Sequence, residues 1–209
     1  MPFVDREIEM SALEAAYKNP IASLFVVYGR RRVGKTTLLA EFCKGKHALY
    51  YLATEESIQA NCAAFREMAA DFLQDELLRS AANAGWEMIF KTLLAQPSEE
   101  KLVIIIDEFQ YLGKADKAFP SVFQKIWDTQ LKNENVEVIL CGSLVHMMME
   151  QTLSYSSPLY GRRTGQIKLK QIPYAYYNQF FPAMSEQERI LYYAVTGGVP
   201  KYIELFHQG

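Results

Sequence analysis

The residues best suited to do chemistry stand together in the octamer Gly29-Arg30-Arg31-Arg32-Val33-Gly34-Lys35-Thr36, which fits the pattern G-x-x-x-x-G-K-[ST]. In this pattern, backbone N–H groups of a glycine-containing loop surround phosphate oxygens. Lys35 is placed to reach the outer phosphates, and the Thr36 hydroxyl is placed to bind Mg²⁺. The octamer therefore predicts a site for a nucleoside phosphate and a magnesium ion.

The segments on either side of the octamer are those that such a loop needs. Residues 23–28 are apolar enough to form a strand that is buried on both faces. After the octamer, apolar residues from Leu38 to Cys43 fall on one side of a helix, and Gly45 is suited to end it. A strand, a glycine loop and a helix in this order direct the helix N-terminus toward a bound anion.

Two acidic residues, Asp107 and Glu108, directly follow residues 102–106, the most β-prone run of the chain. Asp107 stands where a carboxylate can order the water molecules around a nucleotide-bound Mg²⁺. Glu108 can take a proton from water that attacks the γ-phosphate, or orient that water. The alternative interpretations are an acid that only ends a strand and an exposed loop carboxylate.

Ser143 and a pair of arginines are further candidates. Ser143 follows a predicted strand over residues 136–141. Its hydroxyl can bind the γ-phosphate or the attacking water, or it can cap a helix that starts at residue 144. Arg162 and Arg163 precede the last predicted strand. They can stabilise charge on the transferred phosphoryl group, from the same chain or a neighbour, or be solvated surface residues.

The three arginines inside the octamer, Arg30, Arg31 and Arg32, occupy positions where the pattern allows any residue. They form a local basic patch, so contact with nucleic acid is an alternative role for them. The guanine signature Asn-Lys-x-Asp does not occur in the sequence, so adenine is the expected base.

Strands and helices alternate along the rest of the chain, which predicts an α/β fold with a mainly parallel sheet sandwiched by helices. Further strands are expected over residues 48–52 and 166–169. Helices are expected from an Asp5 cap to residue 18, from Ser57 to a break at residues 83–85, and over 86–94, 122–127, 144–150 and after 173, with a polar loop at 113–117. In such sheets ligands bind beyond the carboxyl ends of the strands, so the octamer, Asp107, Glu108 and Ser143 should converge.

Composition limits the class of protein. The 209 residues are 50% hydrophobic and 22% charged, which is typical of a globular domain with a core. The net charge is −2, so no overall basic field attracts nucleic acid. The three cysteines lack metal-ligand spacing and are typical of a reduced, cytoplasmic protein. No apolar run reaches membrane-spanning length, and no membrane partner is expected.

The chain resembles the archaeal-type ATPases, a prokaryotic branch of the AAA+-like and signal-transduction (STAND) phosphate-loop NTPases. The matching segments follow the family's order over nearly the whole chain. They are Phe3-Val4-Asp5-Arg6-Glu7, Tyr28 to Thr37, Ile106-Asp107-Glu108-Phe109-Gln110, Cys141-Gly142-Ser143, Leu159-Tyr160-Gly161-Arg162-Arg163 and Thr196-Gly197-Gly198-Val199-Pro200-Lys201-Tyr202.

The resemblance implies more than the spacing does. It implies five parallel strands with the loop strand central, an ATPase core over residues 1–170, and the start of a small helical lid over residues 171–209. Phe3, Val4 and Pro200 would border adenine, and Thr37 would join the loop in binding ATP. Because the family carries further C-terminal parts, this chain is expected to be an ATPase core with an incomplete lid.

The favoured hypothesis is a Mg²⁺-dependent ATP-hydrolysing switch or regulatory ATPase. The alternative is a nucleotide-dependent module with negligible turnover that binds a partner protein or DNA. Self-association, or a partner bound through the missing C-terminal region, is expected in either case. A small-molecule kinase is disfavoured because Glu108 stands beside the metal acid and no acceptor site is recognisable.

Overall fold

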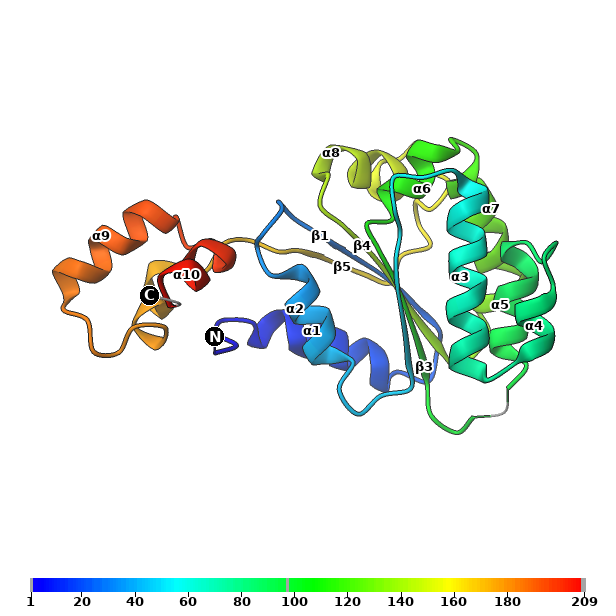
Figure 1. The fold of residues 1–209 in the computed structure, drawn as a ribbon, viewed down its shortest axis with the longest axis horizontal. Helices are drawn as coiled ribbons and strands as arrows, with labels where there is room; N and C mark the ends of the chain where they lie inside the picture. The colour runs from blue at the N-terminus through cyan, green and yellow to red at the C-terminus, as the bar shows by residue number, and fades with distance from the viewer. Residues whose placement is uncertain (1, 97, 208–209) are drawn as a thin grey trace.

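The computed structural model describes residues 2–96 and 98–207 of the chain. At its centre lies a parallel sheet of five strands in the order β2-β3-β4-β1-β5 (Figure 1). The strands are β1 (Ser23–Tyr28), β2 (Ala48–Leu52), β3 (Leu102–Asp107), β4 (Val136–Gly142) and β5 (Gly165–Lys168). The α/β fold is thus as predicted. The middle position, however, belongs to β4, which pairs with both β3 and β1, so the expectation of a central β1 is wrong.

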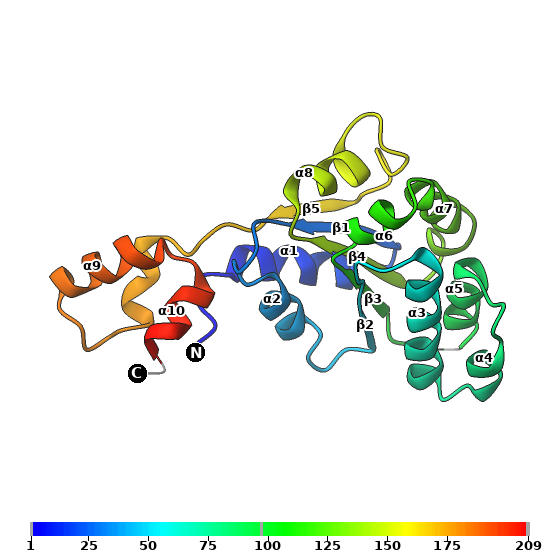
Figure 2. The same cartoon turned by 45° about the horizontal axis from the view of Figure 1, so that its top comes forward.

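Helices cover both faces of the sheet, which explains why β1, β3 and β4 are buried along their whole length. One face packs against α1 (Glu7–Lys18) and α2 (Lys35–Phe42), as Figure 2 shows. The other face and its edge carry α3 (Ile58–Leu73), α4 (Glu76–Ser80), α5 (Trp86–Leu94), α6 (Gln110–Ala115), α7 (Phe119–Ile126) with the π-turn η1 (Trp127–Leu131), and α8 (Val145–Met148) with the π-turn η2 (Met149–Leu153).

Four local expectations about helix ends are corrected. Asp5 does not cap α1, because its φ is 54° and Arg6 occupies the cap position without a side-chain bond. The helix that Ser57 caps ends at Leu73, is followed by Gln74 with a positive φ, and gives way to a new helix from Glu76. The expected polar loop at residues 113–117 is helical up to Ala115. Ser143 does not cap α8, whose cap position is residue 144.

The residues that follow β5 form a helical unit with a core of its own. It contains the 3₁₀ turn η3 (Tyr174–Gln179), α9 (Glu186–Thr196) and α10 (Pro200–His207). Figure 1 shows this unit beside the sheet, next to the chain's N-terminal segment. Its core consists of Val4, Ile172, Tyr177, Phe180, Phe181 and Ile203. Because Val4 belongs to that core, the N-terminal segment joins this unit to α1. None of the helices within residues 2–96 and 98–207 is long and apolar enough to cross a membrane.

One acidic side chain, that of Glu137 in β4, lies where the sheet is fully covered. Its side chain is completely buried, and neither carboxylate oxygen has a hydrogen-bond partner within residues 2–96 and 98–207. Burial raises the pKa of Glu137 to about 8, against an opposing effect of Lys101. The folded protein therefore binds this proton more tightly than the unfolded chain does, where the carboxyl has its ordinary pKa near 4.5.

This difference predicts that protein stability falls as the pH rises. The contribution of the Glu137 proton is fully present below about pH 4.5 and is lost as the pH rises through 8, a loss of about 5 kcal/mol. In Glu137→Gln this decline should disappear, whereas Glu134→Gln, an exposed change just before β4, should retain it. Urea unfolding at pH 5 and pH 9 measures the effect. An equal decline in all three proteins would contradict the assignment.

Candidate functional site

The glycine loop lies between β1 and α2, at the carboxyl end of the sheet. Gly29 is required there because a Cβ at this position would lie 2.3 Å from the Leu169 carbonyl oxygen. Arg32 and Gly34 take positive φ angles of 70° and 93° as the chain curls into α2. The Lys35 side chain is buried inside the curl, where its Nζ donates to the carbonyl oxygens of Gly29 at 3.0 Å and Arg30 at 3.1 Å.

The side chains of Thr36 and Asp107 meet beside this loop. Thr36 Oγ1 donates to Asp107 Oδ2 at 3.3 Å, and the Tyr50 hydroxyl donates to the same oxygen at 2.5 Å. Burial and the neighbouring Asp107 raise the pKa of Tyr50, so the phenol keeps its proton. The other Asp107 oxygen accepts from the Glu108 backbone N–H at 2.9 Å. Asp107 is thus buried at the end of β3 with its orientation fixed on both oxygens.

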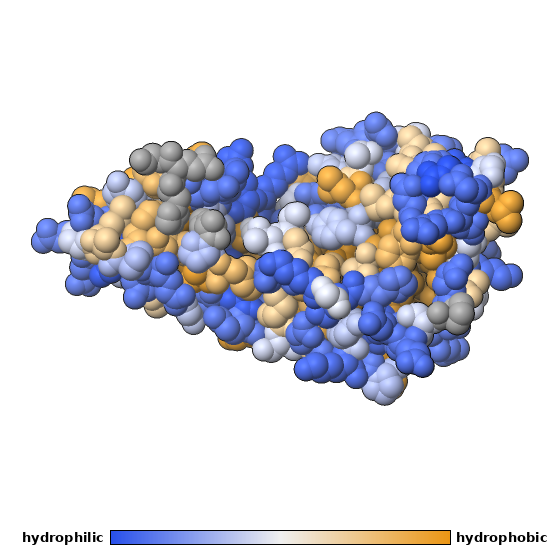
Figure 3. Space-filling view, turned by 60° about the horizontal axis from the view of Figure 1, so that its bottom comes forward, coloured by the Kyte–Doolittle hydropathy of each residue, from blue (hydrophilic) through white to orange (hydrophobic). Residues whose placement is uncertain are grey.

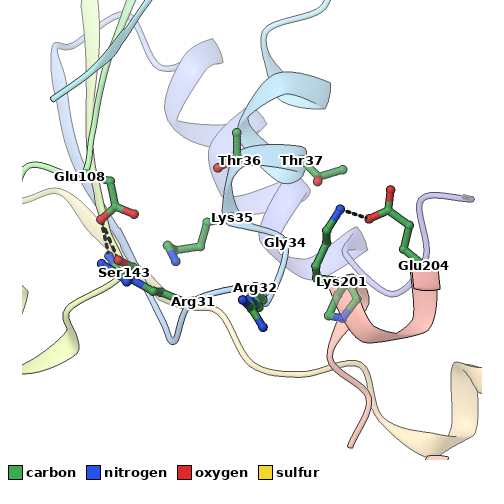
Figure 4. Close-up of a pocket in the computed structure, with 11 residues that line it drawn as sticks. Arg31, Arg32, Gly34, Lys35, Thr36, Thr37, Glu108, Ser143, Lys201 and Glu204 are labelled. Atoms are coloured by element: carbon green, nitrogen blue, oxygen red, sulfur yellow. Dashed lines mark hydrogen bonds and ion pairs between the residues drawn. The ribbon is translucent and has the colours of Figure 1, made fainter. Parts of the chain in front are cut away.

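Glu108 occupies a left-handed backbone conformation with φ of 54°, which is uncommon for a residue with a side chain. One of its carboxylate oxygens accepts from the Ser143 hydroxyl at 2.7 Å and from the Ser143 N–H at 3.1 Å. The same oxygen accepts from the amide of Gln110, a completely buried residue. The carboxylate therefore crosses from the end of β3 to the end of β4, as Figure 4 shows for the pair Glu108 and Ser143.

These groups face a cavity of about 420 Å³, which we call the loop cavity. This volume lies within the range of pockets for small ligands. The loop cavity is lined by Arg31, Arg32, Gly34, Lys35, Thr36, Thr37, Glu108, Ser143, Pro200, Lys201 and Glu204 (Figure 4). The cavity is thus bordered by cationic side chains of the loop, by Lys201 of α10 and by the N-terminus of α2. The electrostatics and the backbone suit a polyanion.

A second cavity of about 300 Å³, the N-terminal cavity, adjoins the first. Its lining includes the N-terminal residues Phe3 and Val4, together with Val33 and Pro200. The turn before Pro200 fits closely, since a Cβ at Gly198 would lie 2.1 Å from the Ile172 carbonyl oxygen. The mixed apolar lining suits a planar base rather than a phosphate.

Arg6 connects the parts that border the N-terminal cavity. Its guanidinium is buried and donates to the carbonyl oxygens of Val33 at 3.1 Å and Lys170 at 2.9 Å. The N-terminal segment, the glycine loop and the connection that follows β5 are therefore held by one side chain. The glycine loop also contacts α10 directly, because the Arg32 guanidinium donates to the Tyr202 hydroxyl at 3.2 Å.

Arg162 and Arg163 lie away from both cavities. Arg162 forms a salt bridge with Asp128 at 2.8 Å, and Arg163 donates to the Leu153 carbonyl oxygen at 3.3 Å. Both arginines precede β5 and so lie at the amino end of the sheet, because β5 runs parallel to β1. The structure therefore does not bring them to the glycine loop of the same chain.

The donor set around Thr36 suits a magnesium ion. The structure describes no group of three or more His, Cys, Asp or Glu side chains that could hold a metal within residues 2–96 and 98–207. Hydroxyl and carboxylate oxygens from Thr36 and Asp107 are nevertheless hard ligands, and their 3.3 Å separation is close to the roughly 3 Å between neighbouring ligands of octahedral Mg²⁺. Such an ion takes its remaining ligands from phosphates and water.

Five residues of the site were not recognised from the sequence. Tyr50 and Gln110 orient the two acids, Arg6 joins the N-terminal segment to the loop, and Lys201 and Glu204 bring charge from α10. Gln110, Arg6 and Lys201 lie inside matching family segments, which was the available signal for these three. Tyr50 offered none, because an aromatic residue in a strand is usually part of the core.

A parallel sheet of this order, with a glycine loop that faces a strand-end carboxylate, defines the class of phosphate-loop NTPases. Within this class, the chain belongs to a family described as ATPase domains predominantly from Archaea, whose model matches residues 3–206. The resemblance seen in the sequence is therefore confirmed.

Individual archaeal proteins resemble the chain in sequence or in fold. The chain is 38% identical over 202 residues to the uncharacterized protein MJECL04 of Methanocaldococcus jannaschii. The aligned segment covers 97% of this chain and 43% of that protein. The Walker-type ATPase PABY2304 of Pyrococcus abyssi has a similar fold, with a TM-score of 0.64, 22% identity, and coverage of 96% of this chain and 65% of that one. A STAND protein with a tetratricopeptide repeat sensor, PH0952 from Pyrococcus horikoshii, also has a similar fold, with a TM-score of 0.62 and 20% identity. That match covers 95% of this chain and 28% of that one. The chain thus spans less than two thirds of each.

Proposed function

We propose that the chain binds ATP together with Mg²⁺ and hydrolyses it, and that it acts as a molecular switch or regulatory ATPase. The observation that supports this most is the pairing of Thr36 with Asp107 beside the buried Lys35 ammonium, with Glu108 lining the same cavity. Family membership supports the same activity.

Each residue has a task in this proposal. The loop N–H groups and the Lys35 ammonium bind the phosphates, and Thr36 and Asp107 would hold Mg²⁺ and its water molecules. When bound, the ion supplies positive charge to the phosphates. Glu108 accepts a proton from the attacking water on the carboxylate oxygen opposite the one that Ser143 and Gln110 hold, so those two residues keep the base in place. Because Arg162 and Arg163 lie at the other end of the sheet, any part they play comes from a neighbouring chain.

The segment over residues 171–209 is proposed as a lid on a core of residues 1–170, of which residues 1, 97 and 208–209 lie outside those described. Pro200 and Lys201 line the loop cavity, so α10 can respond to the bound nucleotide. Figure 3 shows apolar residues gathered on this unit. The exposed large apolar side chains of α9 and α10 include Ile190, Leu191, Val195, Leu205 and Phe206. Such a surface supports contact with another protein or a second copy.

A test compares ATP affinity, by calorimetry with Mg²⁺ present, with the rate of phosphate release. Micromolar binding with steady phosphate release is the expected result. Absence of ATP binding in the folded protein would refute the proposal.

The second candidate is a nucleotide-dependent binding module with negligible turnover, whose lid signals the nucleotide state to a partner protein or DNA. One observation favours it, namely that Ser143 and Gln110 hold the Glu108 carboxylate by three hydrogen bonds. Tight binding without phosphate release would select this candidate over the first.

Ser143 is expected to position Glu108 rather than to bind substrate alone. Its hydroxyl and N–H both donate to one Glu108 oxygen, and Ser143→Ala removes only the hydroxyl. We expect kcat to fall about tenfold with ATP affinity nearly unchanged, because one hydrogen bond to a charged group is lost. Ser143→Thr, which keeps the hydroxyl, should restore most of the rate. A loss of affinity instead of rate in Ser143→Ala would contradict this role.

A further inference from the structure

The loop cavity and the N-terminal cavity share one border. Among the residues that the structure describes, four line both cavities: Gly34, Thr37, Pro200 and Glu204. Of these, only Thr37 and Glu204 carry polar side chains. Thr37 comes from the first turn of α2 and Glu204 from α10, so the border lies between the glycine loop and the lid.

The position of this border determines which part of a nucleotide lies there. Phosphates belong in the loop cavity, where Lys35 and the N-terminus of α2 are, and the base belongs in the N-terminal cavity with Phe3 and Val4. The sugar connects the two parts of the molecule, so it must cross the shared border. Its 2′ and 3′ hydroxyls can each donate a hydrogen bond, so an acceptor at the shared border would bind them.

Glu204 has the chemistry of such an acceptor. Its carboxylate receives a hydrogen bond from Lys201 Nζ at 2.7 Å, which lowers its pKa and keeps it ionised at neutral pH (Figure 4). Lys201 contacts a single Glu204 oxygen in that bond, so the second oxygen and further lone pairs are available. A carboxylate accepts hydrogen bonds from two neighbouring hydroxyls and donates none.

We propose that Glu204 binds the ribose hydroxyls of the nucleotide and thereby makes the site selective for ribonucleotides over 2′-deoxyribonucleotides. This inference rests on the proposed function, since it names the sugar that the same site takes. It also gives α10 a direct contact with the ligand, because Glu204 leaves or approaches the sugar as the lid moves.

The test compares the affinities of ATP and 2′-deoxy-ATP for the wild type and for Glu204→Ala, by calorimetry with Mg²⁺. The wild type should bind ATP about five- to tenfold more tightly, as expected for a hydrogen bond to a partly exposed charged group. In Glu204→Ala the ratio should fall below about twofold. The ratio is the informative quantity, because removal of Glu204 also frees the Lys201 ammonium, which changes the affinity for both nucleotides alike.

Two further variants make the test specific. Glu186→Ala removes an exposed acid from the same lid, outside both cavities, and should keep the wild-type ratio. Glu41→Ala removes an acid that lines the N-terminal cavity alone, and it too should keep the ratio. The inference is overturned if the wild type does not discriminate, if Glu204→Ala still discriminates, or if the ratio collapses in Glu41→Ala instead. If neither nucleotide binds the folded wild type, the proposed function itself fails.

Discussion

Replacing Lys35 with alanine is expected to weaken ATP binding by about a hundredfold or more. The Lys35 ammonium is held inside the loop by the carbonyl oxygens of Gly29 and Arg30, at the place where phosphate oxygens are expected. Removal of a buried, hydrogen-bonded charge from an interface with an opposite charge has an effect of this size. Without the ammonium, the backbone N–H groups, the more exposed arginines, Lys201 and the magnesium ion remain to balance the phosphates. Calorimetry with ATP and Mg²⁺ measures the loss.

Two companion variants separate this effect from a loss of folding. Lys35→Met keeps the aliphatic stem in its buried position, so it should fold like the wild type and still fail to bind ATP. Lys91→Ala removes an exposed lysine from α5, far from the loop, and should bind ATP normally. Undiminished binding by folded Lys35→Ala would refute the assignment of the loop.

The position of the site could be predicted because parallel strands have all their carboxyl ends at one edge of the sheet. The apolar runs before Gly29, Asp107 and Ser143 were long enough to be recognised as buried strands. Gly29 and Ser143 directly follow their strands, and Asp107 is the last residue of β3. The same rule also corrects a hypothesis. Arg162 and Arg163 precede β5 and therefore lie at its amino end, which the order of residues already implied.

The contacts of individual side chains could not be predicted, because they depend on strand order and on packing. Tyr50 reaches Asp107 because β2 is the neighbour of β3, an adjacency that the local pattern does not encode. Likewise, Glu137 lies in a run of residues whose pattern indicates a fully buried strand. That its carboxylate lacks a partner among the described residues follows only from how the helices cover both faces of the sheet. The central position of β4 likewise depends on pairing between strands that are far apart in the sequence.

Replacing Glu108 with glutamine is expected to abolish ATP hydrolysis while ATP binding remains. An amide does not accept a proton from water at neutral pH, and loss of a general base lowers a rate by about a hundredfold to ten-thousandfold. The fold should tolerate the change. Glutamine keeps one acceptor oxygen for the donors on Ser143 and Gln110, and it can adopt the same backbone conformation as glutamate.

The measurement combines single-turnover phosphate release with calorimetric binding of ATP. Glu134→Gln, an exposed change of the same chemical kind, serves as the matched control and should release phosphate at the wild-type rate. If Glu108→Gln turns over as fast as the wild type, Glu108 takes no part in the chemistry, and the hydrogen bonds to Ser143 and Gln110 only stabilise the strand ends. If hydrolysis stops and ATP stays bound, the variant also provides the ATP-bound state in which contacts of the lid with the nucleotide can be examined.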